Sequence, residues 1–205
     1  MRWGCRVAGG AFYHQRVYNR HVEPVEGGVV YISNHQSFFD PILLTNALSR
    51  PGNYMARDTL FRQPMFRRLI KSVNAFPIRR GKADTGALKE AMRRLKNGRA
   101  IVIFPEGTRT RDGHIGPFLP GVSVLSQRAA AWTVPVLLEG AFEVWPRSQT
   151  LPRPGRIYVE YGKPIPREVA KAHTPEQFVE QVRQTLIAMQ SRLRTKLGKP
   201  TLEYP

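Results

Sequence analysis

The stretch Ala100-Ile101-Val102-Ile103-Phe104 is apolar at every position, and it constrains the fold more than any other feature of the sequence. A strand with one face in water alternates apolar and polar residues, whereas a strand of a parallel sheet covered on both faces does not. The run Val29-Val30-Tyr31-Ile32 is equally apolar. Segments with helical spacing of apolar residues lie between such runs. This alternation predicts a single α/β domain with a mainly parallel sheet flanked by helices.

Local signals place the individual elements. Asp84 or Thr85 is suited to cap a helix, and Thr174 and Gln177 match a capping box with Pro175 at the first helical position. Residues 66–73 also show helical spacing, and no repeat or long linker divides the chain. The expected strands are 29–32, 53–56, 75–78, 100–104, 134–138 and 156–161, and the expected helices are 41–48, 84–97, 122–131 and the segment from 175 onward.

The first candidate site is the heptapeptide Asn34-His35-Gln36-Ser37-Phe38-Phe39-Asp40, between the first apolar strand and a helix for which Asp40 is the expected N-cap. A single turn could fold the Asp40 carboxylate back onto the His35 imidazole. Histidine can accept a hydroxyl proton, and a carboxylate on its other ring nitrogen fixes the tautomer and stabilises the imidazolium. The heptapeptide alone leaves open the alternative that His35 only forms structural hydrogen bonds within the loop and that Asp40 only caps the helix.

The second candidate site is Phe104-Pro105-Glu106-Gly107-Thr108-Arg109-Thr110-Arg111, a turn at the end of a buried strand. In an extended loop, Arg109 and Arg111 would point to the same side. Two guanidinium groups facing one way suit phosphate, because each can donate two parallel hydrogen bonds. A solvated turn with surface arginines is the alternative interpretation of this stretch.

Taken together, these stretches carry a family resemblance. Asn34-His35-x-x-x-x-Asp40 followed by Phe104-Pro105-Glu106-Gly107-Thr108-Arg109 resembles the glycerolipid acyltransferases, and most closely the 1-acyl-glycerol-3-phosphate (lysophosphatidic acid) acyltransferases. Two further blocks are similar to that family and occur in the right order. They are Arg57-Asp58-Thr59-Leu60-Phe61 with Pro64, Phe66, Pro77-Ile78 and Arg80, and Val134-Pro135-Val136 with Gly140.

The resemblance implies acyl transfer from acyl-CoA or acyl carrier protein to a glycerol hydroxyl of a lysophospholipid. The donor is a substrate, and neither a cofactor nor a metal is implied. By this resemblance, His35 is the general base, Asp40 supports it, and Arg109 holds the acceptor phosphate. Arg111 and Arg57 are implied as further phosphate contacts. The remaining residues of the implied site support its loops: Asn34, Glu106, Gly107 and Thr108.

The charge balance indicates where such a protein would work. The chain has 32 Lys and Arg against 15 Asp and Glu, a net charge of +17, so an anionic partner is expected. No apolar run reaches the roughly 18 residues needed to cross a bilayer. Residues 1–22 are interpreted as a basic amphipathic segment and candidate membrane-surface anchor, with an amphipathic helix expected over residues 1–20. An acyltransferase domain is expected over residues 23–205. This predicts a peripheral membrane protein on the cytoplasmic side.

Three alternatives remain open from the sequence. A basic protein without catalysis could bind nucleic acid or a membrane, although no recognisable nucleic-acid motif is present and no nucleic-acid partner is expected. A lipid-binding protein that has lost catalysis would not need both His35 and Asp40. Finally, the acceptor could be another lysolipid or glycerol 3-phosphate.

Overall fold

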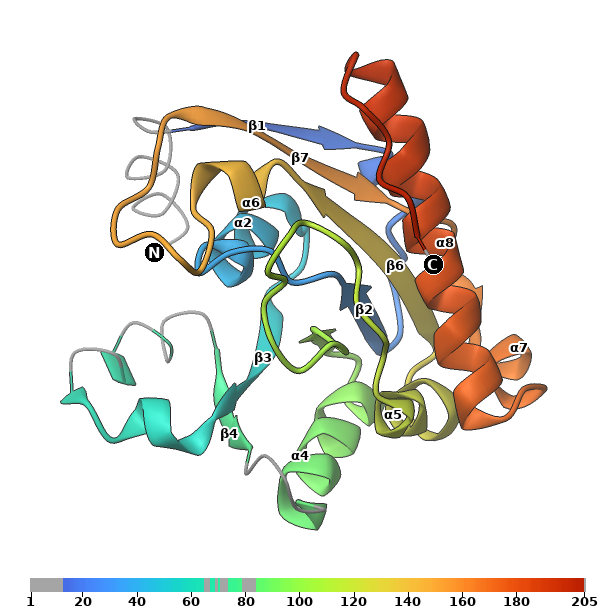
Figure 1. Cartoon of the computed structure of the whole chain (residues 1–205). Helices are drawn as coiled ribbons and strands as arrows, with labels where there is room; N and C mark the ends of the chain where they lie inside the picture. The colour runs from blue at the N-terminus through green and yellow to red at the C-terminus, as the bar shows by residue number, and fades with distance from the viewer. Residues whose placement is uncertain (1–12, 65–66, 69, 71–73, 79–83, 205) are drawn as a thin grey trace.

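The computed structural model describes residues 13–64, 67, 68, 70, 74–78 and 84–204. It is one α/β unit built on a mostly parallel sheet (Figure 1). The strands are β1 (Tyr13–Tyr18), β2 (Val29–Ser33), β3 (Gly52–Arg57), β4 (Phe76–Ile78), β5 (Ala100–Ile103), β6 (Trp132–Glu139), β7 (Gly155–Tyr161) and β8 (Ile165–Pro166). The helices are η1 (Arg20–Val22), α2 (Asp40–Ala47), η2 (Asp58–Phe61), α4 (Thr85–Lys96), η3 (Pro120–Val122), α5 (Ser123–Arg128), α6 (Ala141–Val144), α7 (Arg167–Lys171) and α8 (Pro175–Lys196).

The strand order is β1-β7-β6-β2-β5-β3-β4, with β8 on β6. Strands β2, β5, β3 and β4 run parallel to one another, β6 is parallel to β2, and β7 is antiparallel to β6. Because β5 and β6 flank β2 and share its direction, the carboxyl ends of all three meet at one edge. The residues that follow these three strands therefore come together, as is usual for sites of open α/β sheets.

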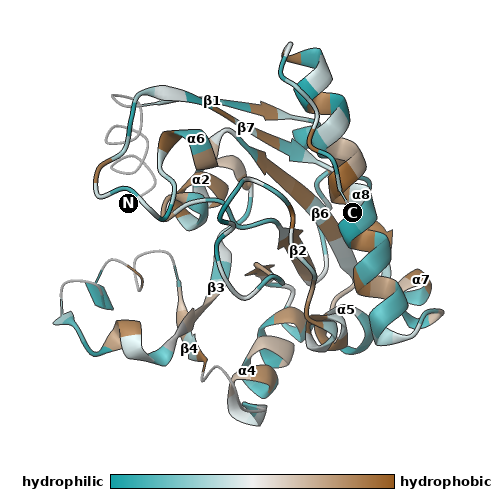
Figure 2. Cartoon of the chain, viewed as in Figure 1, coloured by the Kyte–Doolittle hydropathy of each residue, from teal (hydrophilic) through white to brown (hydrophobic). Residues whose placement is uncertain are grey.

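Helices cover both faces of the sheet, which explains the apolar strands. Alternate side chains of β2 separate into two cores: Val30 and Ile32 pack with α4, α5, α7 and α8, whereas Val29 and Tyr31 pack with α2 and α6. All five residues of β2 and all four of β5 are buried. The hydropathy colouring shows the same pattern, with hydrophobic central strands (Figure 2). The predicted fold class is confirmed.

The predicted helix ends are also confirmed where the structure describes them. The Asp84 carboxylate accepts a hydrogen bond from the Ala87 N–H at 3.0 Å and caps α4. Thr174 and Gln177 form a capping box at the start of α8, with Pro175 as its first residue. These local signals work because they act over only three residues and do not depend on tertiary contacts.

The helix predicted over residues 1–20 is wrong where the structure describes these residues. Residues 13–18 form strand β1, which pairs in parallel with β7, and residues 20–22 form η1. This part of the segment therefore belongs to the sheet and is not a separate amphipathic helix. Residues 1–12 and most of the predicted helix over 66–73 lie outside the described residues. Within the described part of the chain, no helix is both long and apolar enough to span a membrane.

Candidate active site

His35 and Asp40 meet at the carboxyl end of β2. The His35 Nδ1 and the Asp40 Oδ2 are 2.7 Å apart, and the Asp40 carboxylate is fully buried. Asp40 Oδ2 also accepts hydrogen bonds from the backbone N–H groups of Gln36, at 2.6 Å, and Ser37, at 2.8 Å. A carboxylate oxygen that accepts these two N–H groups can also accept the Nδ1 proton of His35. The neutral imidazole then carries its lone pair on Nε2.

These contacts correct the predicted role of Asp40 in the helix. Asp40 is the first residue of α2 and Phe39 is its N-cap, which makes no side-chain capping bond. The Asp40 carboxylate turns back to the loop before the helix and binds His35, Gln36 and Ser37. Its other oxygen, Oδ1, is buried without a hydrogen-bond partner. The carboxylate therefore orders the loop and the imidazole at once.

The imidazole is held on its face as well as on its edge. The ring of Phe104, which follows β5, stacks on His35 with centroids 4.3 Å apart and planes 21° apart. The His35 side chain remains 16% exposed. Among the described residues, Nε2 has no hydrogen-bond partner, so the basic nitrogen is the one that remains accessible. This arrangement suits proton abstraction from a bound hydroxyl.

Asn34 and Gln36 fix the two sides of the histidine. The Asn34 side-chain amide exchanges two hydrogen bonds with the backbone of Leu138 in β6, at 2.9 and 2.8 Å. The Gln36 Oε1 accepts from the backbone N–H groups of Ala141 and Phe142, at 3.1 and 3.2 Å. Asn34 was predicted as a supporting residue. Gln36 was not, because its partners lie more than a hundred residues away, on an element whose position the sequence does not reveal.

The loop after β5 holds the histidine backbone. The His35 N–H donates to Glu106 Oε1 at 3.1 Å, and the His35 carbonyl accepts from the Thr110 N–H at 2.8 Å. Burial raises the pKa of Glu106 to about 8, against the lowering effect of the hydrogen bond from His35. The nearby Asp40 charge also raises this pKa. A carboxyl group that is mostly neutral at pH 7 places no second full negative charge beside the His35–Asp40 pair.

Arg109 lies on the same loop and faces the heptapeptide. Its guanidinium carbon is 3.4 Å from the centroid of the Phe38 ring. Its Nη1 is buried and has no hydrogen-bond partner. Burial lowers the pKa of Arg109, the charge of Arg147 lowers it further, and Asp40 opposes both. Arg109 is thus a cation held beside the His35–Asp40 pair with donor capacity unused by the described residues.

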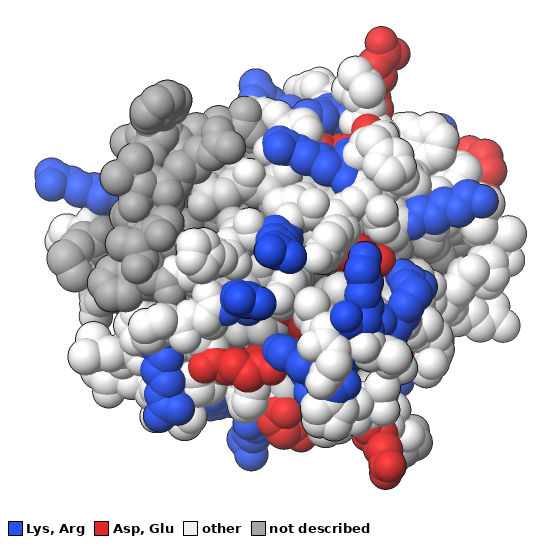
Figure 3. Space-filling view, turned by 90° about the horizontal axis from the view of Figure 1, so that it is seen from above, with Lys and Arg blue, Asp and Glu red and all other residues white. Residues whose placement is uncertain are grey.

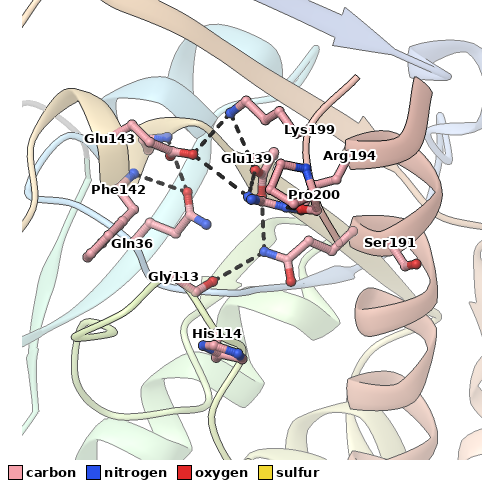
Figure 4. Close-up of polar contacts among 12 residues, drawn as sticks. Gln36, Gly113, His114, Glu139, Phe142, Glu143, Ser191, Arg194, Lys199 and Pro200 are labelled. Atoms are coloured by element: carbon pink, nitrogen blue, oxygen red, sulfur yellow. Dashed lines mark hydrogen bonds and ion pairs between the residues drawn. The ribbon is translucent and has the colours of Figure 1, made fainter. Parts of the chain in front are cut away.

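Helix α8 and the segment after it contact the later part of the loop that follows β5 (Figure 4). The Gln190 side-chain amide donates to the Gly113 carbonyl at 3.2 Å and to Glu139 Oε2 at 3.0 Å. Glu139, the last residue of β6, also pairs with Arg194 at 2.5 Å. The Tyr204 hydroxyl accepts from the Ile115 N–H at 3.0 Å. The end of the described chain therefore helps to position the loop after β5, which carries Arg109.

Comparison with known proteins places this geometry in a family. The sequence model of the acyltransferase family matches residues 14–139, which include both candidate stretches and the three strands that carry them. The chain belongs to the acyltransferase family. The predicted membership is confirmed, and the matched region ends at Glu139, so α6, β7 and α8 lie beyond it.

Several individual relatives of this chain are named as 1-acyl-sn-glycerol-3-phosphate acyltransferases. The chain is 31% identical over 139 residues to a chloroplastic 1-acyl-sn-glycerol-3-phosphate acyltransferase of Brassica napus, covering 66% of this chain and 40% of that protein. It is 29% identical over 161 residues to the 1-acyl-sn-glycerol-3-phosphate acyltransferase of Bacillus subtilis, covering 78% and 77%. The chain spans about two-fifths of the length of the Brassica napus and Arabidopsis thaliana relatives.

A solved structure supports the same fold. The crystal structure of the 1-acyl-sn-glycerophosphate acyltransferase PlsC from Thermotoga maritima matches with a TM-score of 0.80. The match covers 98% of this chain and 80% of that one, at 22% sequence identity. Because α6, β7 and α8 fall within this coverage, the shared fold extends past the region matched by the family's sequence model.

The other residues predicted for the site have different surroundings. Gly107 adopts a left-handed φ of 67° in the turn, which explains a glycine there. Thr108 is exposed, and it is Thr110 whose hydroxyl binds Asp112 and Gly113. Arg111 is exposed and is not among the groups that act on Arg109. Arg57 ends β3, but its side chain lies outside the described part.

Metal binding has no support in the described residues, where no group of three or more His, Cys, Asp or Glu side chains could hold an ion. The side chains gathered at this edge are instead the imidazole of His35, the carboxylate of Asp40 and the guanidinium of Arg109. Such a set can move a proton and neutralise an anion.

Proposed function

We propose that the protein transfers a fatty acyl group from acyl-CoA or acyl carrier protein to the free hydroxyl of 1-acyl-sn-glycerol-3-phosphate, giving phosphatidic acid. The observation that carries this proposal is the His35–Asp40 pair, at 2.7 Å, beside a loop whose Arg109 has an unpartnered nitrogen. The names of the relatives in Brassica napus and Bacillus subtilis agree with this substrate.

The proposed reaction is a direct attack. His35 Nε2 accepts the proton of the acceptor hydroxyl as the oxygen attacks the thioester carbonyl, and the new C–O bond forms. The C–S bond then breaks, and the leaving thiolate accepts this proton from the imidazolium. Asp40 stabilises the imidazolium through Nδ1 in between. Atoms and charges balance without a covalent enzyme intermediate, and no cofactor takes part.

Arg109 has a separate task in this proposal. Its guanidinium lies beside the loop that carries His35 and can donate parallel hydrogen bonds to the acceptor phosphate. Stacking on Phe38 restrains the side chain, so less conformational freedom is lost on binding. Arg111 and Arg57 remain proposed contacts to the same phosphate.

An acyl-transfer assay with a panel of acceptors tests the function. We expect 1-acyl-glycerol-3-phosphate to give the highest kcat/KM, with phosphatidic acid as product by mass spectrometry. The panel should include glycerol 3-phosphate and lysophosphatidylglycerol, each with acyl-CoA and acyl-acyl-carrier-protein donors. Reactions without acceptor measure thioester hydrolysis. Faster transfer to another acceptor would assign the alternative substrate, and no transfer to any of them would reject the proposed function.

We further propose that the protein works as a peripheral protein on the cytoplasmic side of a membrane. The chain carries a net charge of +17, and Lys and Arg side chains outnumber acidic ones on the face shown in Figure 3. Phe38 and Leu119, at the candidate site, are 51% and 57% exposed. Basic and apolar groups together favour an anionic lipid surface.

Vesicle flotation tests this location. We expect the protein to float with vesicles containing anionic lipid and to remain at the bottom with purely zwitterionic vesicles. Raising the salt from about 0.1 M to 1 M shortens the Debye length from roughly 10 to 3 Å and should release much of the bound protein. A protein that stays at the bottom with anionic vesicles at low salt would contradict the proposal.

A further inference from the structure

The turn that follows α6 lies against the heptapeptide of the candidate site. The ring of Trp145 packs on Phe39 with centroids 4.6 Å apart, and on Phe38 at 5.4 Å. The Trp145 indole N–H donates to the Gln149 carbonyl at 3.0 Å, and the Gln149 N–H donates to the Pro146 carbonyl at 3.2 Å. These contacts fix the turn, and Arg147 lies exposed within it.

Arg109 approaches the same aromatic cluster. Its guanidinium lies 3.4 Å from the centroid of Phe38, the ring that Trp145 also contacts. Arg147, two residues after Trp145, is close enough for its charge to oppose that of Arg109 and to lower the pKa of Arg109, second only to burial. Arg109 and the turn that carries Arg147 therefore meet at the ring of Phe38, although they come from separate loops.

Neither Arg109 nor Arg147 is neutralised within the described part of the chain. Among the described residues, no carboxylate forms an ion pair with Arg109 or Arg147, and the buried Nη1 of Arg109 has no hydrogen-bond partner. Asp40 is the acidic group that attracts Arg109, but its Oδ2 already accepts from His35, Gln36 and Ser37. Two like charges brought together without a counter-ion are unfavourable, and an anionic ligand between them would remove that cost.

We propose that Arg147 is the second cation of the acceptor site, and that Arg109 and Arg147 together select acceptors with a phosphate monoester over phosphodiester lysolipids. This inference rests on the proposed function and deepens it. A phosphate monoester carries close to two negative charges at pH 7, because its second pKa is about 6. A phosphodiester carries only one. A pair of guanidinium groups therefore gains more from the monoester, whereas a single one discriminates less.

Arg147 could not be found from the motifs. It lies beyond residues 14–139, the part of the chain that the acyltransferase family model matches. In the sequence it stands in Trp145-Pro146-Arg147-Ser148, which has no phosphate-binding signature. The packing of Trp145 on Phe38 and Phe39, with the hydrogen bonds from α6 to Gln36, brings this turn to the site.

Steady-state kinetics with a monoester and a diester acceptor test the proposal. The acceptors are 1-acyl-glycerol-3-phosphate and lysophosphatidylglycerol of the same chain length. We expect Arg147→Gln to raise KM for the monoester roughly 10-fold, the usual effect of losing one charge-assisted hydrogen bond, with kcat changed less than about 3-fold. The KM for the diester should change less, so the preference for the monoester falls. Arg147→Lys should recover part of the loss.

Arg153→Gln is the matched control, because Arg153 is an exposed arginine of the same connection and does not act on Arg109. Equal effects of Arg147→Gln and Arg153→Gln on the monoester KM would overturn the proposal. So would an equal rise in KM for both acceptors after Arg147→Gln, since that would show no selection.

A binding measurement separates this inference from the proposed function. If the wild-type protein transfers no acyl group, the function fails, but calorimetric titration with short-chain forms of the same two lysolipids still decides the inference. Tighter binding of the monoester that is lost in Arg147→Gln supports it. Equal affinities of the wild-type protein for the two lipids would reject the inference.

Discussion

Replacing His35 with alanine should lower kcat by roughly 10²–10⁴-fold, the usual contribution of a positioned general base. The fold should survive, because the His35 contacts to the neighbouring loop use its backbone: its N–H binds Glu106 and its carbonyl binds Thr110. Both remain in the alanine variant. What is lost is the imidazole that we propose accepts the hydroxyl proton, along with its stacking on Phe104.

One control and one further variant make this result specific. His14→Ala removes an exposed histidine of β1 and should leave kcat unchanged. Asp40→Asn should also lower kcat, because an amide can donate to Nδ1 and so favour the tautomer with the proton on Nε2. Thermal unfolding should show all three variants folded at the assay temperature. A His35→Ala protein that retains more than about a tenth of wild-type kcat would contradict the role of His35 as the base.

The fold was largely predictable because its decisive signals are local. The apolar runs at 29–32 and 100–104 predicted buried parallel strands, and both became central strands of the sheet. Strand β1 was missed because its arginine and apolar residues were read as one face of a helix. In the structure, residues 13–18 are held in extended form by pairing with β7, more than a hundred residues away. Only the tertiary partner decides between the two conformations.

The same difference between local signals and tertiary partners explains which contacts of the candidate site could be predicted. The His35–Asp40 contact was predictable because the two residues are five apart and one loop joins them. The role of Gln36 and the proximity of Arg147 to Arg109 were not, because both depend on α6 lying beside the heptapeptide. That neighbourhood follows from β6 pairing with β2, and strand order is not encoded in the local pattern. The motifs thus identified His35, Asp40 and Arg109, whereas the residues around them could be placed only once the strand order was known.

The largest expected effect on stability is at Glu139, not at the candidate site. Glu139 is fully buried and pairs with Arg194, itself only 11% exposed, at 2.5 Å. Lys199 lies 3.6 Å from the same carboxylate, and Gln190 donates to its other oxygen at 3.0 Å. This group joins the end of β6 to α8 (Figure 4). Removing one partner of a buried pair leaves the other charge without compensation, which typically costs about 3–5 kcal/mol.

Glu139→Gln should therefore destabilise the protein by about 3 kcal/mol, the low end of that range because Arg194 keeps Glu143 at 3.7 Å. For a chain of this size, this corresponds to a fall in Tm of roughly 6–12 °C. Denaturant unfolding and calorimetry would measure both quantities. Glu143→Gln is the matched control: Glu143 pairs with the same Lys199 and Arg194 but is 46% exposed, so its loss should cost less than about 1 kcal/mol.

The double variant Glu139→Gln, Arg194→Met separates the cost of an unpaired charge from the loss of a contact. If the buried Arg194 charge causes the destabilisation, its removal should recover much of the stability lost in Glu139→Gln, because no charge is then left uncompensated. If the pair instead stabilises the protein through its own attraction, the double variant should be no more stable than the single one. Equal Tm values for Glu139→Gln and Glu143→Gln would show that burial does not determine how much each carboxylate contributes to stability.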